Sequence, residues 1–182
     1  MKIAITGHSA GIGKEFAEIL AARGHEIVGL SKRTGDNIRI IPKILDKIEP
    51  CDMFINNAQA GYAQTELLQG IHSRWKMTEK HVWVIGTMMT HQAVAPEQYL
   101  EYYNQKQALE LAIQQLRHVC PAPQITLIRP GGVATHGKEV SNKDCNVNLW
   151  CNTVIDTLLL AESRGMRYSE LSLGNFYKPS NI

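Results

Sequence analysis

Short apolar runs alternate along the chain with longer stretches whose apolar residues recur every three or four positions. The short runs predict β-strands at residues 2–6, 26–30, 53–55, 82–85, 125–128 and 168–173. The longer stretches predict helices at residues 13–22, 42–48, 65–77, 96–120 and 147–161. Strands that alternate with helices are typical of a parallel sheet that carries helices on both faces. We therefore expect one α/β domain over residues 1–182, with about six mostly parallel strands.

The composition excludes several classes of protein. With 44% hydrophobic and 20% charged residues the chain is an ordinary globular one, and its net charge of +2 favours neither a nucleic acid nor a membrane as its main partner. The four cysteines show no metal-site spacing, so no metal is expected, and they are typical of reduced thiols. No apolar run approaches the roughly 20 residues of a membrane span, and the N-terminal run is too short for a signal peptide. We therefore expect a cytoplasmic location.

A glycine-rich segment, Thr-Gly-His-Ser-Ala-Gly-Ile-Gly at residues 6–13, joins the first predicted strand to the first predicted helix. Gly7, Gly11 and Gly13 permit a tight turn and a close approach of a diphosphate to the free N–H groups at the helix N-terminus. A plain strand-to-helix turn is the alternative interpretation. A nucleotide bound here requires a reversal of strand order beside the first strand. We therefore predict a Rossmann-type, doubly wound sheet with the strand order 2-1-3-4-5-6.

Three further motifs follow in order along the chain. Asn-Asn-Ala at residues 56–58 ends the third strand, and Pro-Gly-Gly-Val-Ala-Thr at residues 130–135 closes a later one. Between them, Tyr102 and Lys106 stand four residues apart and therefore share one face of a predicted helix. With the glycine-rich segment, these motifs resemble those of the short-chain dehydrogenase/reductase family, in the family's order. The resemblance implies an oxidoreductase that transfers a hydride between a nicotinamide coenzyme and a small carbonyl or alcohol substrate.

The predicted chemistry centres on Tyr102. An alkoxide left by hydride transfer needs a proton, and a phenol with a pKa near about 10 must become more acidic to act at neutral pH. The ammonium of Lys106, one helical turn away, favours the phenolate and so is expected to lower the pKa of Tyr102. The resemblance gives Tyr102 the acid/base role and gives Lys106 the further task of holding the nicotinamide ribose. It places a substrate-binding hydroxyl at Thr87, with Thr90 as the other candidate; an exposed Tyr–Lys pair on an amphipathic helix is the alternative.

The choice of coenzyme depends on the residues that follow the second strand. Ser31, Lys32 and Arg33 stand there, without a carboxylate before Asp36, and cations accommodate the 2′-phosphate of NADP. We therefore predict NADP(H) in preference to NAD(H), the alternative being a solvated charge pair in a surface turn. The resemblance implies that Asn37 or Asp36 bonds to the adenine amino group. The whole cofactor site that it implies comprises Gly7, Ser9, Gly11, Ile12, Gly13, Ser31, Lys32, Arg33, Asp36, Asn37, Asn57, Ala58, Tyr102, Lys106, Pro130, Gly131, Val133 and Thr135.

The chain departs from the family pattern in four places. Residues 31–52 replace a longer strand-bearing segment, so one edge strand is expected to be missing. Gln59 replaces the glycine that is usual after Asn-Asn-Ala. Residues 58–80 contain no asparagine for the family's proton relay, and Gln64 or an ordered water is the expected substitute. Residues 136–146, which would cover the substrate, are few and polar, and this predicts an open or partner-completed pocket.

Two other functions are compatible with these features. A nucleotide sensor without turnover would keep the fold and the coenzyme, and a protein-interaction module would bind a partner without any nucleotide. The predicted helices at 65–77 and 96–120 are apolar on more than one side, and family members pair through these helices. Such apolar bands usually mark an interface, so we predict a homodimer or a larger homo-oligomer.

Overall fold

Six strands form one parallel sheet in the computed structural model of the chain, which describes residues 1–135 and 144–174. The strands are β1 (Lys2–Thr6), β2 (Glu26–Leu30), β3 (Met53–Asn56), β4 (His81–Ile85), β5 (Gln124–Pro130) and β8 (Glu170–Leu173). Their order is β2-β1-β3-β4-β5-β8, and every neighbouring pair is parallel. Counted along the chain, this is the predicted order 2-1-3-4-5-6.

The sheet ends at β2, as the shortness of the chain predicted. Between β2 and β3 lie only a 3₁₀ turn, η1 (Lys32–Thr34), and the helix α2 (Ile41–Ile48). Pro42 occupies the first turn of α2, where its missing N–H is harmless. A two-stranded sheet of β6 (Val133–Ala134) and β7 (Cys145–Asn146) was not predicted.

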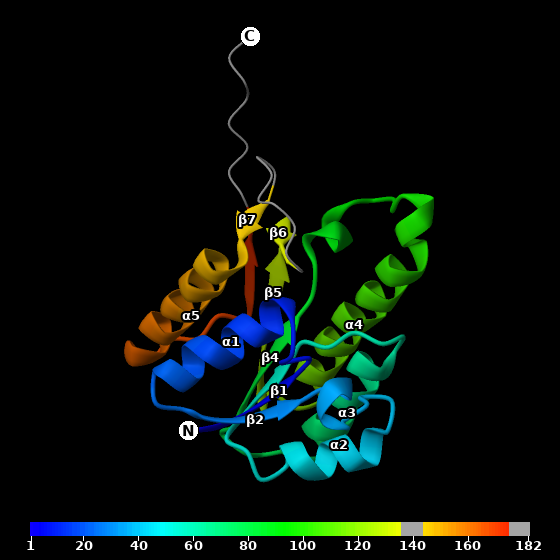
Figure 1. The fold of residues 1–182 in the computed structure, drawn as a ribbon. Helices are drawn as coiled ribbons and strands as arrows, with labels where there is room; N and C mark the ends of the chain where they lie inside the picture. The colour runs from blue at the N-terminus through cyan, green and yellow to red at the C-terminus, as the bar shows by residue number, and fades with distance from the viewer. Residues whose placement is uncertain (136–143, 175–182) are drawn as a thin grey trace.

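The helices cover both faces of the sheet (Figure 1). Helices α1 (Gly11–Ala22) and α5 (Val147–Ser163) lie side by side on one face, and α2, α3 (Ala63–Arg74) and α4 (Leu100–Val119) lie on the other. Each face has its own core of buried apolar side chains. Beneath α1 and α5, the ring of Phe16 lies 6.2 Å from that of Trp83 and 6.1 Å from that of Trp150, centroid to centroid. The central strands β3 and β4 are buried along their whole length, which explains their unbroken apolar runs.

The helix boundaries differ from the predicted ones where the backbone cannot continue a helix. The long helix begins at Leu100, because Pro96 is extended and a 3₁₀ turn at Glu97–Tyr99 follows it. Helix α3 ends at Arg74 and not at Met77, whose φ of 66° lies in the left-handed region. The first helix, α1, starts at Gly11, two residues earlier than predicted.

The apolar residues behind the predicted homodimer are mostly covered within one chain, which corrects that argument. In α3, just after it and in α4, the buried members are Leu67, Leu68, Ile71, Trp75, Leu109, Ala112 and Ile113. All of them except Ala112 belong to the core between these helices, α2 and one face of the sheet. On α4, the exposed large apolar side chains are Leu100 and Leu111, 49% and 58% exposed, and Val119 at the end of the helix. Across the described residues, no helix combines the length and the apolar character that crossing a membrane requires.

Candidate active site

The glycine-rich segment forms a tight bend where β1 meets α1. Gly7 and Gly11 adopt φ values of 73° and 55°, which other residues rarely tolerate. A Cβ atom on Gly13 would stand 2.5 Å from both the carbonyl oxygen of Gly7 and the side-chain nitrogen of Asn57. Helix α1 begins here without a side-chain cap, and the first N–H groups of a helix have no partner within it. The bend therefore presents free backbone donors at the positive end of a helix, which is a suitable site for a diphosphate.

The hydroxyl of Thr6 ties this bend to the end of β3. Its Oγ1 accepts hydrogen bonds from the backbone N–H groups of Asn57, at 3.0 Å, and Ala58, at 3.1 Å. The Asn57 side chain returns a bond of 3.0 Å to the carbonyl oxygen of Thr6. Asn57 is therefore a scaffold residue as well as a predicted cofactor residue. At position 59, where the family pattern has a glycine, the Gln59 side chain donates a hydrogen bond to Gln105 on α4.

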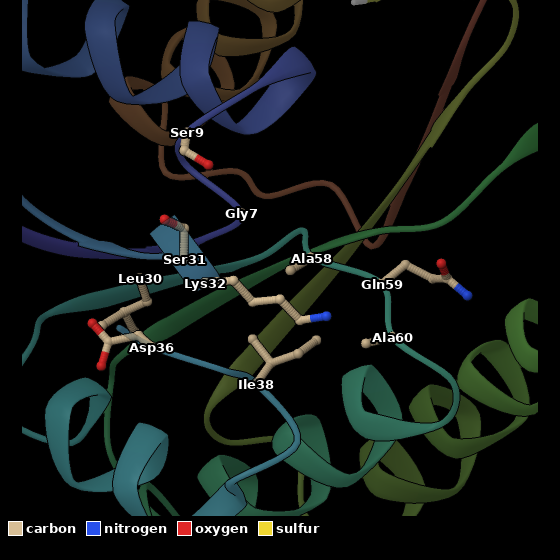
Figure 2. Close-up of a pocket in the computed structure, with 10 residues that line it drawn as sticks. All are labelled: Gly7, Ser9, Leu30, Ser31, Lys32, Asp36, Ile38, Ala58, Gln59 and Ala60. Atoms are coloured by element: carbon tan, nitrogen blue, oxygen red, sulfur yellow. The ribbon is translucent and has the colours of Figure 1, made fainter. Parts of the chain in front are cut away.

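A pocket of about 220 Å³ lies beside the bend (Figure 2). Of the predicted cofactor residues it brings together Gly7, Ser9, Ser31, Lys32, Asp36 and Ala58. Sequence reasoning missed its other lining residues, Leu30, Ile38, Gln59 and Ala60. Leu30 and Ile38 are buried and apolar, and Ala58 and Ala60 are small, so the wall suits a flat aromatic group. Asn37 is not among the lining residues, and its side chain accepts a bond from the backbone N–H of Arg39.

Cations surround the mouth of this pocket. Figure 2 shows the exposed Lys32 side chain extending across the pocket towards Ile38 and Ala60. Arg33, on the same 3₁₀ turn, donates a hydrogen bond of 3.4 Å to the carbonyl oxygen of Ser9. The guanidinium is thereby placed beside the glycine-rich bend.

The carboxylate of Asp36 is buried, and two lysines of α2 neutralise it. It lies 2.6 Å from Lys47 and 3.7 Å from Lys43. These contacts could not be foreseen from motif spacing, because they join a loop to a helix that the family pattern does not fix. They leave the pocket without an uncompensated negative charge.

Lys106 is the most buried of the predicted catalytic residues. It is 3% exposed, and its ammonium donates hydrogen bonds of 2.8 Å to Gln64 Oε1 and to the carbonyl oxygen of Ile85. It also lies 5.6 Å from the centroid of the Tyr102 ring. Gln64 in turn donates to the carbonyl oxygens of Asn56, at 2.7 Å, and Ile85, at 3.0 Å. Gln64, one of the two predicted substitutes for the missing asparagine, therefore contacts the predicted catalytic lysine directly.

Burial is the largest cause of the pKa shifts of both Lys106 and Tyr102. Burial lowers the pKa of Lys106 to about 7, although the carboxylate of Glu110 opposes that change. Burial also raises the pKa of Tyr102 above its ordinary value, while a hydrogen bond with Thr87 opposes the rise. The expectation that Lys106 lowers the pKa of Tyr102 is therefore wrong for this structure. The ammonium faces the ring of Tyr102 and donates its hydrogen bonds to Gln64 and to the carbonyl oxygen of Ile85.

The structure separates the two threonines that were candidates for the substrate-binding hydroxyl. Thr87 is near enough to the phenol of Tyr102 to oppose the rise in its pKa, and it caps the 3₁₀ turn at Met88–His91. The hydroxyl of Thr90 lies 2.7 Å from Glu110 Oε1, and this contact engages the group that would have to bind a substrate. The geometry therefore favours Thr87.

The segment after β5 lies next to the turn that follows Thr87. A Cβ atom on Gly131 would come within 2.9 Å of Gly174 Cα and 3.2 Å of the sulfur of Met88, so this loop packs against the turn that follows Thr87. Val133 enters β6, and Pro130 ends β5. Ile12 is half-buried, and its side chain packs against the core beneath α1 and α5. For Thr135, the placement beside the nicotinamide stays a prediction, and of the expected cover 136–146, residues 136–143 lie outside the described residues.

The hydroxyl of Thr6 provides the sharpest test of this framework. Thr6→Val keeps the shape of the side chain but leaves two backbone donors without an acceptor, so we expect it to cost about 2 kcal/mol or more of unfolding free energy. Thr6→Ser keeps the acceptor and loses one methyl group, worth about 0.8 kcal/mol. Chemical denaturation of both variants measures the difference. A valine variant that is no less stable than the serine variant would contradict the role given to Thr6.

Comparison with known proteins places this arrangement in a structural class. No protein-family model matches the sequence, and no curated protein matches it. A solved alcohol dehydrogenase from the archaeon Thermococcus sibiricus, complexed with 5-hydroxy-NADP, is 18% identical; the match covers 100% of this chain and 99% of that one, with a TM-score of 0.75. A short-chain dehydrogenase from Burkholderia cenocepacia in complex with NADP is 15% identical, with 96% and 88% covered and a TM-score of 0.73.

A third solved structure, the 3-alpha-hydroxysteroid dehydrogenase from Pseudomonas sp. B-0831 complexed with NADH, is 17% identical. That match covers 95% of each chain with a TM-score of 0.62. Likenesses at these levels of identity concern the course of the backbone. The fold of this chain is that of the short-chain dehydrogenases/reductases, the family that its motifs resemble.

Proposed function

We propose that the protein is an NADP(H)-dependent oxidoreductase of the short-chain dehydrogenase type, which interconverts a small carbonyl compound and its alcohol. The observation that carries this proposal is the grouping of Thr87, Tyr102 and Lys106. They lie at the carboxyl edge of a parallel sheet whose glycine-rich bend suits a diphosphate. Solved structures with the same fold are named dehydrogenases, and those compared above carry NADP, a derivative of it or NADH.

The residues present fit a nicotinamide dinucleotide. Gly13 leaves a close approach open where any side chain would collide with Gly7, and the start of α1 offers free N–H donors. The pocket between Leu30, Ile38 and Ala60 suits the adenine base. When bound, the coenzyme would supply or accept the hydride.

The charges around the pocket support NADP(H) over NAD(H). Both cations follow β2: Arg33 lies beside Ser9 and Lys32 extends across the pocket, so a phosphate on the adenosine ribose would be attracted here. Asp36 would repel that phosphate if its charge were free, but Lys43 and Lys47 compensate it. The rim is therefore cationic, and this supports a preference for the phosphorylated coenzyme.

The chain's own residues can move the proton that the reaction requires. In the reductive direction the hydroxyl of Tyr102 donates a proton to the substrate oxygen, while Thr87 holds that oxygen by a hydrogen bond. The ammonium of Lys106 faces the Tyr102 ring, 5.6 Å from its centroid, so a positive charge lies near the phenolate that remains, although burial keeps the pKa of Tyr102 above its ordinary value. Gln64 and the carbonyl oxygen of Ile85 keep the ammonium in place during this step.

Coenzyme preference is tested first by titration. We expect saturable quenching of protein fluorescence by NADPH at lower concentrations than by NADH. Arg33→Ala should raise the Kd for NADPH about tenfold, the loss of one charge-assisted hydrogen bond, and leave that for NADH nearly unchanged. Arg164→Ala, which removes an exposed cation at the far end of α5, is the matched control. Saturable binding of neither coenzyme would end the proposal.

Turnover is tested on a panel of carbonyl compounds with NADPH. Tyr102→Phe should lower kcat at least about 100-fold, the usual contribution of a positioned acid. Tyr168→Phe, an exposed tyrosine just before β8 at the opposite edge of the sheet, should leave kcat nearly unchanged. In the wild type, kcat/KM for reduction should fall as pH rises through about 7, because Lys106 loses its charge there. Equal activity of the two tyrosine variants would show that the catalytic assignment is wrong.

A nucleotide sensor without turnover is the second candidate. The raised pKa of Tyr102 and the engagement of Lys106 with Gln64 favour it, because both oppose proton transfer at neutral pH. Tight NADPH binding with no activity on the panel is the outcome that this candidate predicts.

A homodimer in the cytoplasm remains part of the proposal. Leu100 and Leu111 stand three turns apart on α4 and are exposed, which supports pairing through this helix. Light scattering at micromolar concentration should give at least twice the mass of 20.4 kDa. The mass of a single chain would contradict it.

A further inference from the structure

Glu110 is buried on α4, one helical turn after Lys106, and it is 8% exposed. Arg129, the penultimate residue of β5, binds it with both arms of the guanidinium: Nε donates to Oε1 at 3.0 Å and Nη2 to Oε2 at 2.7 Å. Nη1 of the same arginine donates to Glu170 at 2.7 Å. A charge buried to this degree is costly unless it is paired. Arg129 thus compensates the charge of Glu110. The pair places a carboxylate close to the predicted catalytic residues.

Glu110 also fastens the turn that follows Thr87. The hydroxyl of Thr90 lies 2.7 Å from Glu110 Oε1 and 2.7 Å from the carbonyl oxygen of Thr87. Within the turn, the N–H of Met89 donates to Thr87 Oγ1 at 3.2 Å. Gln107 of α4 adds a bond of 3.2 Å to the carbonyl oxygen of Thr90. With the bond from Tyr103 to the carbonyl oxygen of Gln92, these contacts attach the turn to the helix that carries Tyr102 and Lys106 at three points.

The same carboxylate connects the third part of the site. Arg129 immediately precedes Pro130, the start of the loop that packs against Met88. Glu110 therefore touches the turn after β4 directly and reaches the loop after β5 through Arg129. Its charge also acts on Lys106, whose other neighbours are Tyr102, the neutral Gln64 and a carbonyl oxygen.

We propose that Glu110, held by Arg129, is a positioning residue that fixes the Thr87 turn against the helix bearing Tyr102 and Lys106. An ion pair that served stability alone would need neither its bond to Thr90 nor its place between three segments of one site. The consequence for turnover rests on the proposed function, whereas the consequence for the turn does not.

Two variants separate the link from the ion pair. Glu110→Gln keeps the shape of the side chain and removes its charge. Thr90→Val leaves the ion pair intact and removes only the hydroxyl that reaches Glu110. Thr90→Ser keeps that hydroxyl and loses only the methyl group. Glu170→Gln is the matched control, because it alters the same arginine on its other side.

The first readout is hydrogen–deuterium exchange of residues 86–92 in the coenzyme-free protein. Exchange there should become about tenfold faster in Glu110→Gln and Thr90→Val, because local opening is held back by these contacts. Thr90→Ser and Glu170→Gln should match the wild type, and β1 and β3 should exchange equally slowly in all variants. Unchanged exchange in both test variants would overturn the proposal.

The second readout is turnover with NADPH. In the two test variants kcat should fall about 10- to 100-fold, as expected for a misplaced substrate-binding group, while KM for NADPH stays within about twofold. Thr90→Ser should recover most of kcat. Faster exchange with an unchanged kcat would overturn the positioning role. If no variant, wild type included, turns over any substrate, the proposed function has failed, and the exchange data alone decide whether Glu110 holds the turn.

Discussion

The site depends on one costly feature, an ammonium group removed almost completely from water. Lys106 keeps a charge there only because Gln64 and the carbonyl oxygen of Ile85 accept its hydrogen bonds and Glu110 stands one turn away. Those three partners come from α3, β4 and α4. The packing of α3 and α4 on the sheet therefore has to be accurate before the lysine can be charged at all.

The charges at the carboxyl edge of the sheet follow the same rule. Asp36 and Glu110 are both buried carboxylates, and each is met by cations from another element, Lys47 in one case and Arg129 in the other. Pairing removes most of their field from the surrounding space. Around the adenosine side this leaves Lys32 and Arg33 as the uncompensated charges, and on the other side it leaves Lys106 beside the phenol of Tyr102.

Sequence patterns predicted what local geometry controls. The glycine-rich bend and the shared face of Tyr102 and Lys106 follow from local spacing, and the strand order follows from the reversal that a nucleotide site at this bend requires. The structure confirms the order and the bend. The sign of the Tyr102 pKa shift, the lysines on Asp36 and the link from Thr90 to Glu110 were missed, because burial and contacts between elements depend on how the whole chain packs. For Gln64 the absence of asparagine between residues 58 and 80 was a usable signal.

The chain can retain this site although it is short, because its sheet is shortened at the edge next to β2. The segment that is missing relative to the family pattern lies beyond β2, at the edge of the sheet. Every proposed catalytic and diphosphate-binding group follows β1, β3, β4 or β5, or stands on α4 between them. Removing an edge strand costs some apolar contact but leaves the switch between β1 and β3 unchanged. In its place α2 approaches the end of β2, and the lysines that neutralise Asp36 come from that helix. The segment between β2 and β3 thus contributes directly to the charge of the pocket proposed for adenosine.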